Sequence, residues 1–315
     1  MNLDKKSLKL LEALDMDGRL SLSKLAKRTG MSKELASYKL KAMEAKGILR
    51  KKYASIDGAR LGYERALLLI KYRHMNSSLQ KLIIKYLENA QNFTVVLDLT
   101  GKWDMLLMLW VKNMHEYKDI EDLFMKKFGK FVREKIVLIN TKRFRFKHRF
   151  IYGSSDLQKI TTGCYSNENI DETDKIIIRE LSKNCRTPTA KIAKVAGMSA
   201  VAVKNRIKSM EKRGIIAGYH IMLDTPYFGY SQYNVMLVLE NPAIKNNIIA
   251  YLSMLPNVMG ITEEIGEYDL MCEIYVKNMK DLDKVLAALR EKFPSVVDKE
   301  ILLVDEKAVL RGPDA

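Results

Sequence analysis

Apolar and polar positions between residues 21 and 53 alternate with the period of two short helices followed by a strand. Ser21 and Ser32 stand where each helix needs an N-cap, and Gly30 can take the positive φ that ends the first helix. The second helix repeats its apolar residues at i, i+4 and i+7, which predicts one buried stripe made of Ala36, Leu40 and Met43. Its opposite side is polar and cationic.

Gly47 ends this second helix, and residues 48–53 are predicted to be the basic strand of a hairpin because three cations follow each other there. A helix with a small polar and cationic face beside a basic hairpin is what recognition of the DNA major groove requires. An ordinary helical hairpin with a solvated polar face is the alternative for this stretch when it is taken alone.

The same stretch occurs a second time. Residues 3–63 align without a gap with residues 170–230, so that the turn glycines Gly30 and Gly47 match Gly197 and Gly214. Helix propensity alone does not place two glycines, each followed by the same residue type, at matching positions. After a shift of two residues the match continues through a Gly-x-x-Asp turn and beyond. The whole chain is therefore one unit used twice.

The second part of each unit alternates strand and helix patterns in the order β-α-β-β-α-β. In unit one we expect strands at 66–72, 93–100, 105–111 and 132–139, with helices at 78–89 and 116–128. This order predicts an antiparallel sheet with two helices on one face, the ferredoxin-like arrangement of the α+β class. The predicted domains are 1–62 (helical), 63–152 (ferredoxin-like), 153–169 (linker), 170–229 (helical) and 230–315 (ferredoxin-like).

Cations and aromatic residues alternate along residues 141–152, which places them on opposite faces of a strand. The preferred interpretation is an edge strand whose aromatic face is buried and whose basic face is solvated. The alternative is a second contact with nucleic acid, in which the aromatic side chains stack on bases.

The net charge of +16 lies entirely in the first half of the chain. Residues 1–169 hold 34 Lys and Arg against 18 Asp and Glu, whereas residues 170–315 hold 20 of each kind. A polyanionic partner is therefore expected, mainly for unit one. Charge alone would fit RNA or an anionic membrane surface as well.

The cysteines, the histidines, the apolar segments and the lack of catalytic motifs exclude several classes of protein. The three cysteines are far apart and odd in number, which indicates a reducing compartment, and the four histidines show no metal-ligand spacing. No long apolar segment predicts a membrane span or a signal peptide. A Ser-His-Asp set and a phosphate-binding glycine loop are also lacking. We therefore expect a cytoplasmic protein with no catalytic residues, no metal and no cofactor.

The segments Leu-Ala-Lys-Arg-Thr-Gly-Met-Ser and Met-Glu-Ala-Lys-Gly-Ile-Leu of unit one resemble the Lrp/AsnC (feast/famine) transcription regulators. The part with the Gly-x-x-Asp turn is similar to the ligand-sensing domain of that family. The resemblance extends over nearly the whole chain, because each of the two units resembles the family separately. It implies a winged helix-turn-helix joined to an α+β effector domain, double-stranded DNA as partner, association of copies through the effector domains, and an amino acid or related small molecule as effector.

Carried over by position, the resemblance implies three groups of site residues. In unit one the DNA-binding residues would be Lys33, Glu34, Ser37, Tyr38 and Lys41, with Arg50, Lys51 and Lys52 on phosphate. In unit two they would be Val201, Lys204, Asn205 and Lys208. The effector turns would be Gly101 with Asp104 and Gly266 with Asp269, for which plain hairpin turns are the alternative. Residues 215–220 of unit two contain no Lys or Arg, so unit two would either bind DNA more weakly or serve as a structural partner of unit one.

These observations predict a sequence-specific DNA-binding transcription regulator, controlled by a small ligand, that is not an enzyme. The rival hypothesis is a tetrapyrrole enzyme, because the siroheme decarboxylases resemble the same two-part architecture and the basic surplus suits a substrate with several carboxylates. A third hypothesis is a sensor or assembly protein whose helix-turn-helix has lost its DNA.

Overall fold

The computed structural model describes residues 3–90 and 92–310. Each unit begins with three helices, and they form because their caps and apolar stripes agree. Ser32 accepts a hydrogen bond from the Leu35 amide (3.1 Å), and Gly30 adopts φ 66° at the end of the preceding helix. The helices are α1 (Lys5–Leu14), α2 (Leu22–Thr29) and α3 (Lys33–Ala45) in unit one, and α7 (Glu172–Lys183), α8 (Thr189–Ala196) and α9 (Ala200–Lys212) in unit two.

The strands that follow these helices pair with each other across the two units. Strand β1 (Leu49–Ile56) runs antiparallel to β7 (Ile216–Leu223), and together they form a two-stranded sheet that we call the ribbon. The basic hairpin expected within unit one is therefore corrected to a ribbon shared by both units. The reason is packing, because Ile221 and Leu223 of β7 enter the helical core of unit one, while Ala54 and Ile56 of β1 enter that of unit two.

The second part of each unit has the predicted β-α-β-β-α-β order, which confirms the ferredoxin-like fold. Unit one contains β2 (Glu64–Tyr72), α4 (Ser77–Asn89), β3 (Phe93–Thr100), β4 (Met105–Val111), α5 (Met114–Phe128) and β5 (Val132–Phe146). Unit two contains β8 (Ser231–Leu239), α10 (Lys245–Met254), β9 (Val258–Ile265), β10 (Leu270–Val276), α11 (Met279–Lys292) and β11 (Val296–Leu310).

The strands of both units form one sheet, in the order β2-β4-β3-β11-β8-β10-β9-β5-β6. Strand β5 also pairs with β2, so the sheet closes on itself, and we call this closed sheet the barrel. The last strand of each unit passes from its own sheet to the edge of the other unit, as β11 pairs with β3 and β5 with β9. Closure leaves few strand edges unpaired.

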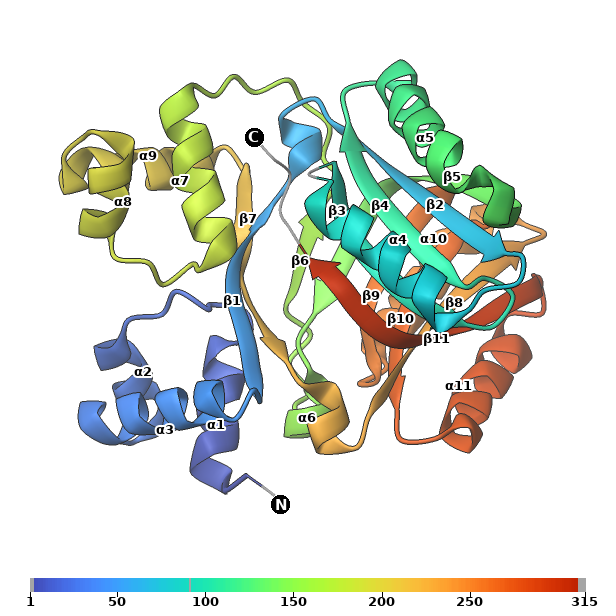
Figure 1. Cartoon of the computed structure of the whole chain (residues 1–315). Helices are drawn as coiled ribbons and strands as arrows, with labels where there is room; N and C mark the ends of the chain where they lie inside the picture. Colours follow the sequence, from blue (N-terminus) through green and yellow to red (C-terminus); the bar gives the residue numbers. More distant parts are fainter. Residues whose placement is uncertain (1–2, 91, 311–315) are drawn as a thin grey trace.

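The inside of the barrel is filled by side chains from both units, among them Leu67, Leu106, Met236 and Leu302. The helices lie outside it and bury their apolar stripes against the outer face of the strands, in one core for each unit. Figure 1 shows the barrel on one side of the molecule and the two groups of three helices on the other side, with the ribbon between them.

The segment 141–152 was expected to be an edge strand with a buried aromatic face and a solvated basic face. Phe144 and Phe146 are buried as expected, but the edge position and the solvated basic face were wrong. Strand β5 continues through Phe146 and is covered on both sides by β9 and β6 (Lys159–Thr162), and Arg145, Lys147 and Arg149 are buried. The short helix α6 (Arg149–Tyr152) follows, and the Arg149 guanidinium donates to the carbonyls of Ser253 and Leu255 (2.8 and 2.7 Å) at the end of α10.

Residues 153–169, expected to be a linker, contain β6 and are bound to unit one. The buried carboxylate of Asp57 accepts hydrogen bonds from the amides of Gly163 (2.9 Å) and Cys164 (3.2 Å). The Glu168 amide donates to the Arg60 carbonyl (2.8 Å). The segment is thus an ordered part of the sheet rather than a free connection. Within the described residues, no helix is both long and apolar enough to cross a membrane.

Candidate nucleic-acid interface and cationic cavity

The face of α3 opposite its apolar stripe is open to solvent. Ala36, Leu40 and Met43 are buried in the helical core, as the spacing predicted. Lys33, Glu34 and Lys41 are exposed, Ser37 is half-buried, and the Tyr38 side chain keeps 71% of its surface accessible. A large aromatic side chain with so much free surface has no role in the core of this domain, so it is available to a partner.

Helix α9 presents the corresponding face in unit two. Val203, Ile207 and Met210 are buried, while Lys204, Asn205 and Lys208 are exposed and Val201 is 68% accessible. In Figure 1 both helices lie on the side of the molecule away from the barrel.

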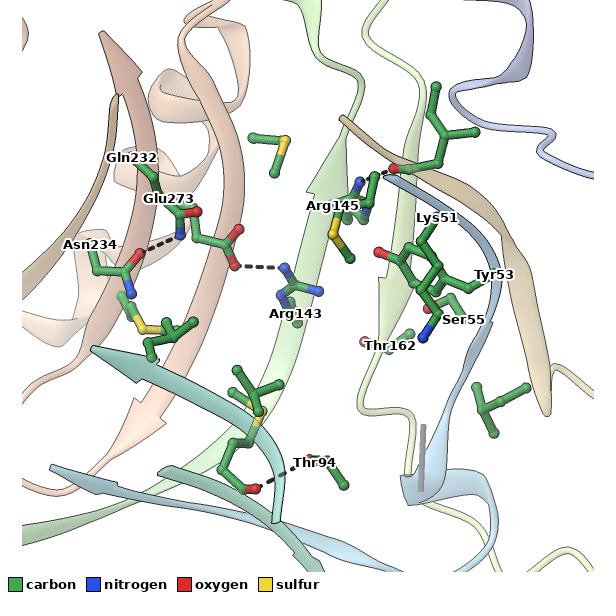
Figure 2. Close-up of a pocket in the computed structure, with 18 of the residues that line it drawn as sticks. Lys51, Tyr53, Ser55, Thr94, Arg143, Arg145, Thr162, Gln232, Asn234 and Glu273 are labelled. Atoms are coloured by element: carbon green, nitrogen blue, oxygen red, sulfur yellow. Dashed lines mark hydrogen bonds and ion pairs between the residues drawn. The ribbon is translucent and has the colours of Figure 1, made fainter. Parts of the chain in front are cut away.

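The three cations expected to bind phosphate are only partly accessible, because they belong to the ribbon. Arg50 forms an ion pair with Asp224, and Lys52 forms one with Glu44 and is largely buried. Lys51 points into a cavity between the ribbon and the barrel (Figure 2), and burial lowers the pKa of its amine. A role on phosphate stays a prediction for all three, and Arg50 is the most exposed of them.

This cavity has a volume of about 200 Å³ and is lined by strands of both units. Figure 2 shows Lys51 and Tyr53 on the ribbon, with Arg143 and Arg145 of β5 between the ribbon and Glu273 of β10. Its apolar lining includes four side chains that are flexible or aromatic, namely Met108, Trp110, Met259 and Met271. Sequence reasoning missed this site. The alternation of cations with aromatics in β5 was a signal for it, but those cations were expected to face solvent.

Cationic groups outnumber carboxylates in the cavity. The charged residues that line it are Lys51, Arg65, Arg143, Arg145 and Glu273. Glu273 binds the Arg143 guanidinium at 2.6 Å. Burial lowers the pKa of Arg65 to about 9, and the nearby charge of Arg143 contributes to this shift. A lowered pKa means that the cation is not fully compensated by its surroundings.

Two histidines lie near the ribbon, and one of them, His148, also lines the cavity. The His148 ring nitrogen Nδ1 lies 2.9 Å from the buried carboxylate of Asp15, and the His148 amide donates to the same group (2.6 Å). His220 is fully buried in β7, and burial together with the charges of Arg145 and Arg143 holds its pKa well below the usual range. His220 is therefore neutral at physiological pH.

The two Gly-x-x-Asp turns meet where the units join. The Lys102 amine lies 3.1 Å from the Glu267 carboxylate, and the buried Trp103 donates to the Tyr268 hydroxyl at 3.5 Å. The Asp104 carboxylate accepts hydrogen bonds from the Tyr72 amide (2.8 Å) and the Lys71 amine (2.7 Å). Asp269 likewise accepts from the Leu239 amide (2.8 Å).

These contacts match the alternative in which the turns are structural. Both aspartates hold the neighbouring strand, β2 or β8, and neither cavity described for this chain is lined by Gly101, Asp104, Gly266 or Asp269. An effector contact at these four residues stays a prediction. Among the described residues there is also no group of three or more His, Cys, Asp and Glu arranged to hold a metal ion.

Two family models match the helical parts of the chain. One describes a winged helix-turn-helix DNA-binding domain and matches residues 3–50, and the other describes the AsnC-type helix-turn-helix domain and matches residues 170–211. The two matches agree with the internal repeat found in the sequence.

Similar curated proteins are transcriptional regulators of single-unit length. The HTH-type transcriptional regulator LrpA of Pyrococcus abyssi is 35% identical over 118 residues, which is 38% of this chain and 84% of LrpA. The regulatory protein AsnC of Haemophilus influenzae is 27% identical over 144 residues, which is 45% of this chain and 96% of AsnC.

Among solved structures, that of the siroheme decarboxylase NirDL covers 98% of this chain and 94% of its own, with a TM-score of 0.67 and 16% identity. NirDL has also been solved with an iron-uroporphyrin III analogue. The expectation that this chain is not an enzyme is thereby corrected, because the architecture it shares over its full length is that of an enzyme. At 16% identity this likeness establishes the fold alone. The 35% sequence identity with LrpA, of which the chain covers 84%, shows that the chain belongs to the Lrp/AsnC family.

Proposed function

We propose that this protein is a sequence-specific DNA-binding transcription regulator whose two winged helix domains bind one duplex, and that a small ligand controls its affinity for DNA. The observation that carries the proposal is the exposed polar face of α3 and α9, with Tyr38 71% accessible beside Lys41. An α-helix of this kind fits the major groove, where a base pair presents a distinct pattern of donors and acceptors. The regulators LrpA and AsnC support the proposal as relatives.

The two domains are expected to contribute unequally. Helix α3 carries Lys33, Tyr38 and Lys41, and Arg50 follows it at the start of β1. Helix α9 carries Lys204 and Lys208, but the strand after it has no Lys or Arg. Since each phosphate contact adds to a salt-dependent affinity, unit one is proposed to supply most of the binding energy and unit two to add specificity and fix the spacing of the site.

The test begins with selection of bound duplexes from genomic DNA at two salt concentrations, followed by affinity measurements on the selected site. Lys41→Ala and Lys204→Ala each remove one cation from an exposed face. Each is expected to weaken binding by about 1–3 kcal/mol, and a change in base preference would identify a contact to a base rather than to phosphate. Lys85→Ala, at an exposed position of α4, is the control with the same change of charge. Wild-type affinity in both variants would contradict the proposal.

The cationic cavity favours a second candidate function, an enzyme that acts on a tetrapyrrole with several carboxylates. Arg65, Arg143 and Arg145 would bind the carboxylates, and the full-length likeness to NirDL supports the candidate. The cavity volume of about 200 Å³ lies below the range of about 300–1,000 Å³ that drug-sized ligands occupy, which favours a smaller ligand.

Siroheme added to the purified protein tests this candidate directly. A shift of the Soret band together with a loss of mass equal to CO₂ in the tetrapyrrole would support a decarboxylase. An unchanged spectrum at saturating protein concentration would exclude tetrapyrrole binding, and it would leave the DNA proposal as it stands.

A further inference from the structure

The cavity between the ribbon and the barrel is built like a binding site for an anion. It joins two parts of the molecule, because Lys51 and Tyr53 come from β1 of the ribbon and Arg143 and Arg145 come from β5 of the barrel (Figure 2). Arg65, at the start of β2, forms the third guanidinium of its wall. Groups that are far apart in the sequence therefore meet at this point.

The hydrogen bonds around these guanidiniums leave them incompletely satisfied. Arg65 Nε donates to the Met108 sulfur (2.6 Å), which is a weak acceptor. Arg145 donates from Nη2 to the Ile221 carbonyl at 3.4 Å, and its Nε has no partner among the described residues. Arg143 holds Glu273 at 2.6 Å, but its Nε also lacks a partner in the described part of the chain. Buried cations in excess of carboxylates are costly, and an anion from solution would offset that cost.

Nearby groups, inside and outside the lining, compensate Arg145 but do not compensate Arg65. Burial disfavours the Arg145 cation, but Tyr53, Asp15 and Glu273 outweigh burial and raise the pKa of Arg145. Glu264 and Asp57 interact electrostatically with Arg65. Burial raises the pKa of the Glu264 carboxyl to about 7, so near neutral pH it is only partly ionised. Asp57 accepts three backbone amides within its own turn and from residues 163 and 164. Glu273 is the carboxylate of the lining, and it is in direct contact with Arg143.

The rest of the lining indicates the kind of anion. Met108, Met259, Met271 and Trp110 provide soft, adaptable apolar surface, which suits a carbon skeleton and offers nothing to an inorganic ion. Two amide side chains, Gln232 and Asn234, add polar groups on the far wall. Guanidiniums bind carboxylates through paired N–H groups, so several of them favour a ligand with more than one carboxylate. The volume of about 200 Å³ limits the ligand to a small metabolite.

We propose that this cavity binds a small organic di- or tricarboxylate, and that the bound anion ties the ribbon to the barrel and thereby changes the affinity for DNA. The second half of this statement rests on the proposed function. Strand β1 begins four residues after the end of α3, and β7 begins four residues after the end of α9. A ligand that fixes the ribbon therefore restricts both recognition helices at once.

Binding is measured first without DNA, by calorimetry and thermal unfolding of the full-length chain with succinate, 2-oxoglutarate, citrate and L-glutamate. Inorganic phosphate and sulfate form the second arm. We expect at least one carboxylate to bind and to raise the Tm, with the inorganic anions binding at least tenfold more weakly. Equal binding of phosphate or sulfate would overturn the assignment to an organic ligand, and no binding of any carboxylate at millimolar concentration would overturn the site.

Variants separate this site from a merely structural cluster. Arg65→Gln removes one of the crowded cations, so we expect the ligand-free protein to unfold at a higher Tm while the carboxylate binds at least tenfold more weakly. A structural role for Arg65 would instead lower the Tm. Arg143→Gln is expected to lower affinity similarly, and Arg133→Gln, exposed on the same strand, is the matched control that leaves binding unchanged. Unchanged binding in Arg65→Gln and Arg143→Gln together would overturn the site.

The final measurement is DNA affinity of the wild-type chain with and without the carboxylate that binds. A change of fivefold or more in either direction supports coupling. If the carboxylate binds but the DNA affinity is unchanged, the proposed coupling to DNA binding is wrong, while the assignment of the cavity as a carboxylate site holds. If the chain binds no DNA but does bind the carboxylate, the proposed function fails while the cavity assignment holds.

Discussion

At the scale of single residues, buried and half-buried polar side chains hold neighbouring segments together, both within one unit and between the two units. Asp57 holds the segment after β5 through backbone amides, Asp104 and Asp269 hold neighbouring strands, and Arg149 satisfies carbonyls at the end of α10. Glu264 differs from these, because it is buried with Asn140 as its hydrogen-bond partner and forms no ion pair with any residue that the structure describes. The contacts of the other side chains compensate the loss of their hydration. For Glu264 the free-energy cost of burial depends on pH, because only the ionised carboxylate is costly to bury.

Glu264 makes stability depend on pH. Burial raises its folded-state pKa to about 7 from an ordinary value of 4.5. The neutral carboxyl is favoured in the folded state, so its stabilising contribution is complete below pH 4.5 and is lost as the pH rises through 7. We expect Glu264→Gln to remove up to about 3 kcal/mol of this dependence, measured by urea unfolding between pH 4.5 and 8. Glu291→Gln, exposed on α11, should keep the wild-type profile. An unchanged profile in Glu264→Gln would contradict the assignment.

At the scale of elements, most helices and strands could be predicted from the sequence, because caps, glycines and apolar periods act locally. Strands β3 and β4 begin and end at the predicted residues. Strand β5 runs seven residues beyond its predicted end at residue 139, because its continuation pairs with β9 of the other unit. The period of two within a strand does not show which distant strand it pairs with. The cavity was missed for the same reason, since Arg65 and Arg143 are brought together only by the closed sheet.

The segment of residues 153–169 is another element whose order depends on distant contacts. Asp57→Ala removes the acceptor for the Gly163 and Cys164 amides and should cost about 1–3 kcal/mol in the free energy of unfolding. Release of the segment is also expected to raise the rate at which a thiol reagent labels Cys164, whereas Cys185 and Cys272 stay buried and slow. Asp122→Ala, at an exposed carboxylate of α5, is the control. Equal labelling rates in the two variants would mean that Asp57 does not hold the segment.

At the scale of the whole molecule, the two units behave as one folded body. Two 15-residue strands, β5 and β11, leave their own units and complete the sheet of the other. The ribbon does the same for the helical domains, since β1 and β7 each pack into the core of the opposite unit. The internal repeat indicated two similar units, but a gapless alignment does not show whether its copies stand apart or interlock. Association with further copies of the chain stays a prediction.

Interlocking explains why the turn between β3 and β4 begins with glycine. Gly101 has φ 146°, a conformation that side chains rarely adopt, and a Cβ there would lie 2.7 Å from the Ile301 carbonyl oxygen of β11. Gly266 stands in the same relation to β5, where a Cβ would lie 2.7 Å from the Leu138 side chain and 3.1 Å from the Val137 carbonyl oxygen. Each glycine therefore lets the last strand of the other unit pass close to the turn.

Gly101→Ala is accordingly expected to lower the free energy of unfolding by about 2–4 kcal/mol, because backbone strain and a contact with backbone oxygen add. Gly153→Ala is the matched control, since Gly153 has φ 65° with no heavy atom within 4 Å of the added Cβ. Strain alone should cost it about 1 kcal/mol. Urea unfolding of both variants measures the difference. Equal losses of unfolding free energy would mean that β11 shifts to accommodate the added Cβ at Gly101. Because β11 joins the two units, the larger loss should appear in a single unfolding transition that both units share.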